Sequence, residues 1–229
     1  HGEYDLLKEM LKVINFSSSD TMFILGDVVD RGNKPIDILL YIKDKPNIEL
    51  LMGNHEEMFL DYIFSDSYFR FINRELYYKN GGFSTLQQFE ALSMDTQIEL
   101  LNYLKNLKKY KIVNTKSGNF ILVHSGLNLT GLDDLEDINK VMSIQSDSDL
   151  LWSREEFFMY PGIPNYRIIF GHTVTKYLYS YTSGEDKFDI WYDPVHKDKI
   201  GIDCGATFKD YGGKLSCLRL DDMVEFYVF

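Results

Sequence analysis

The chain has 229 residues, of which 45% are hydrophobic and 26% are charged, and its 24 basic and 35 acidic side chains give a net charge of −11. This composition is typical of a globular domain and excludes collagen, coiled coil and disorder as descriptions of the whole chain. The acidic balance argues against a nucleic-acid partner, because a phosphate backbone would be repelled. No apolar run approaches the ~18–20 residues of a membrane-spanning helix. The two cysteines form no CxxC pair, which fits the reducing cytoplasm better than a disulfide scaffold. Together with the lack of a long apolar run and of a visible secretory leader, this predicts a soluble, cytoplasmic protein without a membrane partner.

Apolar periodicity predicts an α/β chain in which short strands alternate with helices. In chain order, helices are predicted over residues 3–14, 35–43 and 56–64, a helix-rich segment over about 65–115, and strands over 21–25, 48–52, 120–123 and 167–170. The last third predicts antiparallel strands over 188–192, 199–204, 214–220 and 223–229, with a tight turn at Asp221-Asp222. Because no repeat or linker interrupts the chain, we expect a single domain over residues 1–229 with a helical insertion at about 65–115.

The helical segment is rich in aromatic residues between positions 68 and 89. We expect these side chains to pack a small core of the insertion, and a substrate groove is the alternative. Asn80-Gly81-Gly82 predicts a turn within the segment.

Four predicted strands end in clusters of glycine and polar residues. The clusters are Gly26-Asp27, Gly53-Asn54-His55-Glu56, His124-Ser125-Gly126 and Gly171-His172-Thr173. Because strand ends are where ligands bind in α/β sheets, we expect the four clusters to converge on one site. Imidazole and carboxylate groups without thiolates suit manganese, iron or zinc.

Several of these clusters resemble the motifs of one family. Residues 26–32 (GDVVDRG) and 53–56 (GNHE) resemble the paired signatures of the metal-dependent phosphoprotein phosphatases, the PPP family of metallophosphoesterases. His1-Gly2 is similar to the end of the family's GDxHG motif, and residues 124–126 and 171–173 are similar to its HSG and GHT elements. Trp152-Ser153-Arg154 resembles a phosphate-binding arginine motif of short bacterial and phage members.

The resemblance runs from residue 1 to about 220. It implies the calcineurin-like metallophosphoesterase fold, an α/β/β/α sandwich in which two mixed β-sheets pack together between helices. It also implies two divalent metal ions, for which we expect manganese, with iron, zinc, nickel or magnesium as alternatives. The implied ligands are His1 for the first ion, Asp27 as a bridge between the ions, and Asn54, His124 and His172 for the second ion.

The resemblance further implies a reaction in which a hydroxide that bridges the metal ions attacks phosphorus directly. His55 would protonate the leaving oxygen, and Asp30 would orient its ring. Arg31 and Arg154 would bind the phosphate oxygens.

Simpler roles remain as alternatives for these residues. Asp27 and Asp30 could cap the helix that begins near Pro35, and His55 could be an ordinary residue at a helix start. Arg154 could pair with its neighbouring glutamates on the surface. The sequence leaves Asp203 open, as either a second contact of the site or a turn residue, and His196 is expected in a loop.

One family residue lies outside the sequence. The GDxHG motif carries an aspartate two residues before the position of His1, and this aspartate would be a ligand of the first ion. We expect it in a preceding segment of the molecule; without it, the first ion should bind weakly.

The sequence therefore favours a serine/threonine protein phosphatase, whose substrate is a phosphoprotein or a small phosphoester. A symmetrical diadenosine-tetraphosphate hydrolase is the alternative with the same site, but such enzymes typically read GNHD where this chain has Glu56. An alternative of another class is a phospho-ligand binding module without catalysis, which would not need His55, Asp30 and Arg31. The oligomeric state and the physiological substrate have no signature in the sequence.

Overall fold

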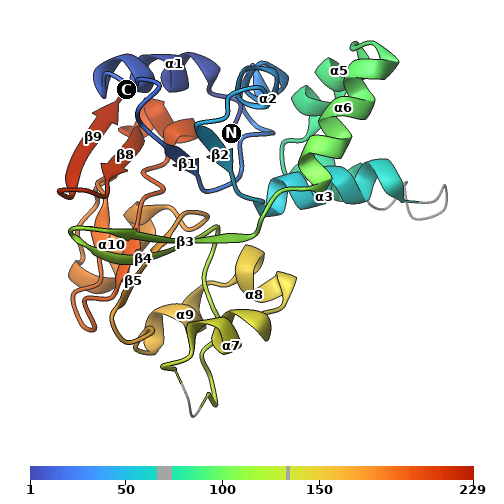
Figure 1. The fold of residues 1–229 in the computed structure, drawn as a ribbon. Coiled ribbons are helices and arrows are strands. Elements are labelled where there is room, and N and C mark those ends of the chain that lie inside the picture. Colours follow the sequence, from blue (N-terminus) through green and yellow to red (C-terminus); the bar gives the residue numbers. More distant parts are fainter. Residues whose placement is uncertain (66–73, 133–134) are drawn as a thin grey trace. The chain divides into compact units, whose positions relative to one another are not determined.

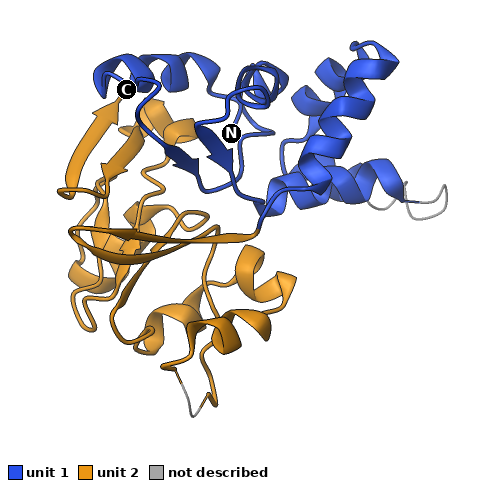
Figure 2. Ribbon diagram, viewed as in Figure 1, with its two compact units in different colours: residues 1–108 blue, residues 109–229 orange. Residues whose placement is uncertain are grey.

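The computed structural model describes residues 1–65, 74–132 and 135–229. These residues form two compact units, residues 1–108 and residues 109–229 (Figure 2). The predicted site residues are divided between the units. Unit 1 contains His1, Asp27, Asp30, Arg31, Asn54 and His55, and unit 2 contains His124, Arg154 and His172.

Unit 1 is built around a parallel pair of strands, β1 (Met22–Ile24) and β2 (Ile48–Leu50). The helix α2 (Pro35–Ile42) connects them, with proline in its first turn, where the missing N–H costs nothing. Because the strands are parallel, their carboxyl ends meet at the same edge of the sheet. The residues that follow β1 and those that follow β2 are therefore neighbours.

The helices of unit 1 bury one face each. In α1 (Tyr4–Val13), the buried residues Leu6, Leu7, Met10 and Leu11 recur at helical spacing. The chain then continues through α3 (Asn54–Phe64), a helical stretch at residues 74–79, α5 (Phe83–Glu90) and α6 (Met94–Lys105) (Figure 1).

The described aromatic residues of the helical segment pack into the main core of unit 1. Phe89 meets Phe59 of α3 with ring centroids 5.1 Å apart, and Tyr77 stacks on Tyr62 at 5.7 Å. Phe89 and Tyr77 both belong to one buried cluster that also includes residues of α1 and α2. The expectation of a separate small core was therefore wrong for these residues, because α3 offers them a larger apolar surface. Tyr68, Phe69 and Phe71 lie outside the described residues.

Unit 2 contains a five-stranded mixed sheet in the order β3-β4-β5-β7-β6. Its strands are β3 (Tyr110–Thr115), β4 (Gly118–Val123), β5 (Tyr166–Phe170), β6 (Trp191–Tyr192) and β7 (Lys199–Gly201). The long strands β3 and β4 form an antiparallel hairpin (Figure 1). The pairs β4–β5 and β5–β7 are parallel, with Ile121 opposite Ile168.

The remaining elements of unit 2 are short. They are the helices α7 (Ile138–Ser143), α8 (Asp147–Trp152), α9 (Glu155–Met159) and α10 (Thr175–Ser183), the 3-10 helix η1 (Ala206–Tyr211), and the antiparallel hairpin of β8 (Leu215–Arg219) and β9 (Val224–Val228). The turn between β8 and β9 contains Asp221-Asp222, as predicted.

The α/β class, the predicted helices and the predicted strands are confirmed. Residues 110–115 differ: they were expected in the helical segment but form β3, whose β-branched and aromatic side chains suit a strand. The last third is not purely antiparallel, because β7 pairs in parallel with β5. The packing of two sheets and the single-domain boundaries stay predictions. In the part of the chain that the structure describes, no helix is long and apolar enough to cross a membrane.

Candidate functional site

The candidate metal centre of unit 1 starts from His1 and Asp27. The Nδ1 of His1 donates to the carbonyl of Val29 at 3.1 Å, and its Nε2 lies 3.4 Å from Oδ2 of Asp27. A backbone carbonyl on one ring nitrogen fixes the tautomer that presents the other nitrogen as a metal ligand. The ligand atoms of His1, Asp27 and His55 all lie within 4.8 Å of one another. The donor set of unit 1 therefore fits a divalent metal ion.

The loop after β1 has an unusual backbone. Asp27, Asp30 and Arg31 have φ of 55°, 66° and 63°, in the left-handed region that side chains other than glycine seldom adopt. Each such residue costs on the order of 1–3 kcal/mol, and strain of this kind concentrates at functional sites. Contacts with residues outside the loop must therefore stabilise this backbone conformation.

Glu56 provides much of that support. Its buried carboxylate accepts backbone N–H groups of Asp27 at 2.7 Å and Val28 at 2.8 Å, which follow β1. It also accepts the N–H of Gly53 at 3.0 Å, at the start of α3. One anion thus joins the loops that follow the two parallel strands. Sequence reasoning used Glu56 only as a family marker and missed this function, although its place in the first turn of a helix was a signal.

Asn54 and His55 open α3 and are both buried. The backbone N–H of His55 donates to Oδ1 of Asp27 at 3.0 Å. The α3 start and the Asp27 carboxylate are therefore in direct contact, as the convergence of the two strand ends predicted.

The His55 ring lies between an acidic and a basic side chain. Its Nδ1 bonds Oδ2 of Asp30 at 2.7 Å, and its Nε2 lies 3.0 Å from a guanidinium nitrogen of Arg31. Arginine can only donate, so Nε2 accepts and the ring proton sits on Nδ1, where Asp30 accepts it. A metal ion on Nε2 would first have to displace the guanidinium, so His1 and Asp27 are the better ligands. This geometry disfavours the reading of His55 as an ordinary helix-start residue.

Asp30 has two more partners that the sequence did not indicate. The hydroxyls of Tyr77 and Thr85 both donate to its Oδ1, at 2.5 and 2.6 Å. Burial and the nearby Asp30 carboxylate raise the pKa of Tyr77 well above its usual value, which keeps the hydroxyl protonated as a donor.

In unit 2, the histidines after β4 and β5 lie together. The ring centroids of His124 and His172 are 5.0 Å apart, and the N–H of Gly171 donates to the carbonyl of His124 at 2.8 Å. His172 has a left-handed backbone, with φ of 62°. The parallel pairing of β4 with β5 explains this contact, because both strand ends reach the same edge.

Arg154 is exposed and lies beside the second of these strand ends. Its guanidinium donates to Oγ1 of Thr173 at 3.2 Å. The preceding Ser153 donates its N–H to Oγ of Ser125 at 3.0 Å, and the Trp152 ring lies edge-on to His172 at 6.3 Å between centroids. The segment 152–154 is therefore held against the loops that carry His124 and His172.

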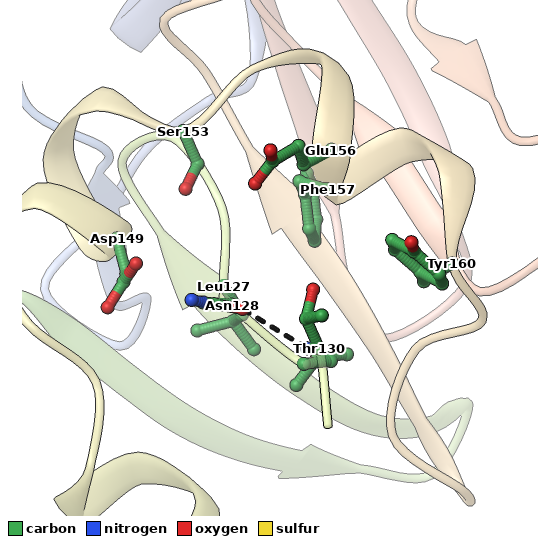
Figure 3. A pocket seen from close by; sticks show the side chains of 9 residues that line it. Leu127, Asn128, Thr130, Asp149, Ser153, Glu156, Phe157 and Tyr160 are labelled. Atoms are coloured by element: carbon green, nitrogen blue, oxygen red, sulfur yellow. Dashed lines mark hydrogen bonds between the residues drawn. The ribbon is translucent and has the colours of Figure 1, made fainter. Parts of the chain in front are cut away.

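A small pocket lies next to the same segment of unit 2 (Figure 3). Its walls include Leu127 and Asn128, just beyond Gly126, and Ser153, Glu156 and Phe157, around the start of α9. Figure 3 also shows the hydrogen bond from the N–H of Thr130 to the Asn128 side chain, which is 3.1 Å long. The pocket adjoins two of the segments that carry predicted site residues.

Asp203, which the sequence left open, has a structural role. Asp203 accepts the N–H of Gly205 at its Oδ1, 3.0 Å away, and its carbonyl accepts the N–H of Thr175 at 2.8 Å. These contacts match the turn role. His196 lies in the loop between β6 and β7, as predicted.

Comparisons with known proteins identify the family of this chain. A family profile described as calcineurin-like phosphoesterase matches residues 1–200. Serine/threonine-protein phosphatase 2 of Salmonella typhimurium (strain LT2) is 28% identical over 190 residues, which cover 80% of this chain and 80% of that protein. Serine/threonine-protein phosphatase 2B catalytic subunit A2 of Saccharomyces cerevisiae is 29% identical over 163 residues, which cover 67% of this chain and 24% of that protein.

Two further similarities are more limited. A symmetrical bis(5'-nucleosyl)-tetraphosphatase of Actinobacillus pleuropneumoniae (serotype 5b, strain L20) is 38% identical over 58 residues, which cover 24% of this chain and 22% of that protein. Among solved structures, a cold-active protein tyrosine phosphatase matches 99% of this chain and 75% of its own, with a TM-score of 0.53 and 18% identity. At that identity, the match bears on the fold alone.

Proposed function

The chain belongs to the calcineurin-like phosphoesterase family, and we propose that it is a metal-dependent phosphomonoesterase that hydrolyses phosphoserine and phosphothreonine. The observation that carries the proposal is the His55 ring, held by Asp30 at Nδ1 beside the His1–Asp27 pair. A binding module would need the metal ligands and the cationic groups, but not an oriented proton donor. The reading as a hydrolase therefore explains more of the site.

We propose that the chain binds two divalent ions. His1 and Asp27 would hold the first, Asp27 would also reach the second, and Asn54, His124 and His172 would complete the second. When bound, such ions supply an activated water and neutralise charge on the phosphoryl group. Manganese is our first choice for both ions, since imidazole, carboxylate and amide ligands without thiolates suit it.

The chain's own residues would carry the proton and hold the substrate. His55, with Asp30 on Nδ1, presents Nε2 to the leaving oxygen and would donate a proton there as the P–O bond breaks. Arg31 and Arg154 would bind the phosphate oxygens, since a guanidinium offers a planar pair of donors that matches them. Asp30 would balance the positive charge on the imidazolium before the transfer.

Two observations favour a protein phosphatase over a dinucleotide hydrolase. The similarity to the Salmonella protein phosphatase spans 80% of both chains, whereas the similarity to the tetraphosphatase spans 24% of this chain. The net charge of −11 also disfavours a highly anionic dinucleotide away from the metal site. A phosphoprotein or a small phosphoester is therefore the proposed substrate. The two free thiols suit the reducing cytoplasm, which we propose as the location.

The test is an assay on metal-stripped protein with Mn²⁺, Mg²⁺, Zn²⁺, Fe²⁺ or Ni²⁺ added back. We expect phosphate release from a phosphoserine peptide, highest with Mn²⁺. ADP release from diadenosine tetraphosphate at a higher kcat/KM than phosphate release from the peptide would favour the dinucleotide hydrolase. Binding of the phosphopeptide without turnover under every metal would favour the binding module.

A further inference from the structure

The buried carboxylate of Asp30 is bound on both oxygens. It is 0% exposed; Oδ2 accepts from His55, and Oδ1 accepts the hydroxyls of Tyr77 and Thr85. Thr85 Oγ1 also accepts the backbone N–H of Asp30 at 2.9 Å. Tyr77 and Thr85 lie outside every motif that the sequence displays, 47 and 55 positions from Asp30.

This set of contacts fixes the plane of the carboxylate. A buried anion needs donors on each oxygen, because an unsatisfied lone pair is costly away from water. With Oδ1 held by two hydroxyls, Oδ2 can only face His55. The hydroxyls therefore determine how Asp30 meets the imidazole, and through it the direction of Nε2.

The turn at residues 80–82 packs against both Tyr77 and Arg31. The carbonyl of Gly81 accepts the backbone N–H of Arg31 at 3.0 Å, and a Cβ on Gly81, where φ is +94°, would lie 2.8 Å from Arg31 Cγ. A Cβ on Gly82 would lie 2.3 Å from the ring of Tyr77. The two glycines thus let the turn pack directly against Arg31 and Tyr77, which gives the Asn-Gly-Gly sequence a purpose beyond chain reversal.

We propose that Tyr77 and Thr85 are positioning residues of the reaction, whose hydroxyls hold Asp30 so that His55 is aimed to protonate the leaving oxygen. This inference rests on the proposed phosphomonoesterase function and adds to it two residues that touch neither metal nor substrate. Gly82 contributes to the same arrangement, because its lack of a side chain leaves room for the Tyr77 ring.

A positioning role and a merely structural role of these hydroxyls lead to different rate changes on different esters. Proton donation matters most when the leaving group is a poor one, and little when the leaving alkoxide is already stable. A change that misaims His55 should therefore slow esters of weakly acidic alcohols more than esters of acidic phenols. A change that only loosens the fold should slow both alike.

The main experiment compares Tyr77→Phe with wild type in the Mn²⁺-loaded protein, on phenyl phosphate and on p-nitrophenyl phosphate. We expect kcat to fall roughly 10- to 100-fold on phenyl phosphate and less than about threefold on p-nitrophenyl phosphate, with KM unchanged. Tyr78→Phe is the matched control, because it removes a hydroxyl from the same helical stretch, one that accepts from the exposed Arg74 side chain at 3.1 Å. Equal losses on both esters, or none, would overturn the inference.

A second pair of variants guards against misfolding. Thr85→Ser keeps the hydroxyl and should retain the wild-type ratio of the two rates, whereas Thr85→Val should shift that ratio in the same direction as Tyr77→Phe. Failure of serine to retain the ratio would show that packing, not the hydroxyl, matters at this position.

A spectroscopic readout does not depend on turnover. In protein with ¹⁵N-labelled histidine, the Nδ1–H of the buried His55 should give a downfield proton resonance, and Tyr77→Phe should move it further downfield because Asp30 loses a donor and becomes a stronger acceptor. An unmoved resonance would overturn the inference even if activity fell. A wild-type protein inactive on both esters would instead overturn the proposed function, and the positioning role with it.

Discussion

Arg31 donates to Nε2 of His55 across 3.0 Å, on the ring nitrogen that the proposed reaction requires to carry a proton. The guanidinium and a protonated Nε2 cannot share this contact, because both are donors. A phosphate group in the site offers the guanidinium a better acceptor. We infer that substrate binding draws Arg31 away from His55 and so frees Nε2 to be protonated.

Because of this exchange, substrate binding should depend on the planar shape of the Arg31 guanidinium and not only on its charge. Replacing it with lysine keeps the charge but removes the paired donors, so we expect Arg31→Lys to raise KM for p-nitrophenyl phosphate by roughly tenfold and to lower kcat as well. Steady-state kinetics in Mn²⁺ measures both. Arg219→Lys, at the exposed end of β8, is the matched control and should behave as wild type. Wild-type kinetics for Arg31→Lys would remove Arg31 from the phosphate site.

His55 should be separable from metal binding. Because its ring nitrogens face Asp30 and Arg31, we expect His55→Ala to retain bound Mn²⁺ and to lower turnover by ~10²–10⁴. Metal content after desalting and kcat on phenyl phosphate give the two readouts. His196→Ala, in the loop between β6 and β7, is the control substitution. Loss of metal in His55→Ala would make His55 a ligand and leave the reaction without its proposed acid.

Unlike His55, Asp27 should be needed for metal binding and for activity alike. An amide in place of the carboxylate removes the negative charge that faces His1 and would be shared by the ions, so Asp27→Asn should lose metal and activity together. Isothermal titration with Mn²⁺ measures the first loss, and a phosphate-release assay measures the second. Asp37→Asn, on the exposed side of α2, should change neither. Full metal occupancy in Asp27→Asn would contradict the bridging role.

The strand ends and their motifs could be predicted because their signals are local. Runs of apolar residues mark β1, β2, β4 and β5, and the polar clusters follow each run directly. The strand β3 was missed because Tyr110–Thr115 follows α6 closely and carries no break of its own. Its assignment to the sheet depends on pairing with β4, which is a tertiary contact.

The contacts of Asp30 are of two kinds: one joins residues of recognised motifs, and the others join residues that only the fold brings together. The contact of Asp30 with His55 was predicted, since both lie in recognised motifs. The contacts of Tyr77 and Thr85 could not be predicted, because nothing near them in sequence indicates that the stretch 74–85 packs against the loop after β1. Only the folded register of that stretch brings their hydroxyls to Asp30.

Glu56 is expected to contribute to the stability of unit 1. Its buried carboxylate accepts N–H groups from the loops after β1 and β2. Glu56→Gln would aim an amide donor at these donors, so we expect it to lower the free energy of unfolding by about 1–3 kcal/mol. Urea unfolding followed by circular dichroism measures the change. Glu57→Gln, the next residue of α3, is the control, and equal stability of the two variants would contradict the role given to Glu56.

The two thiols should be slow to react in the folded protein. Burial raises the pKa of Cys204 to about 12 and that of Cys217 to about 11. An ordinary thiol has a pKa of ~8.5, so at pH 8 the thiolate fractions here fall roughly 10²- to 10³-fold below it. We expect labelling by a disulfide reagent to be slower by that order at pH 8, to rise about tenfold per pH unit towards pH 10, and to become fast for both cysteines in denaturant.

Rapid labelling of the native protein at pH 8 would show that either thiol is open to solvent as a thiolate, and it would give the chain a soft ligand for Zn²⁺ that the site in unit 1 lacks. Slow labelling leaves imidazole, carboxylate and amide groups as the donors available to an added metal. The preference among Mn²⁺, Zn²⁺ and Ni²⁺ in the reconstitution assay can then be attributed to those groups, because protonated thiols compete only weakly for the ion at that pH.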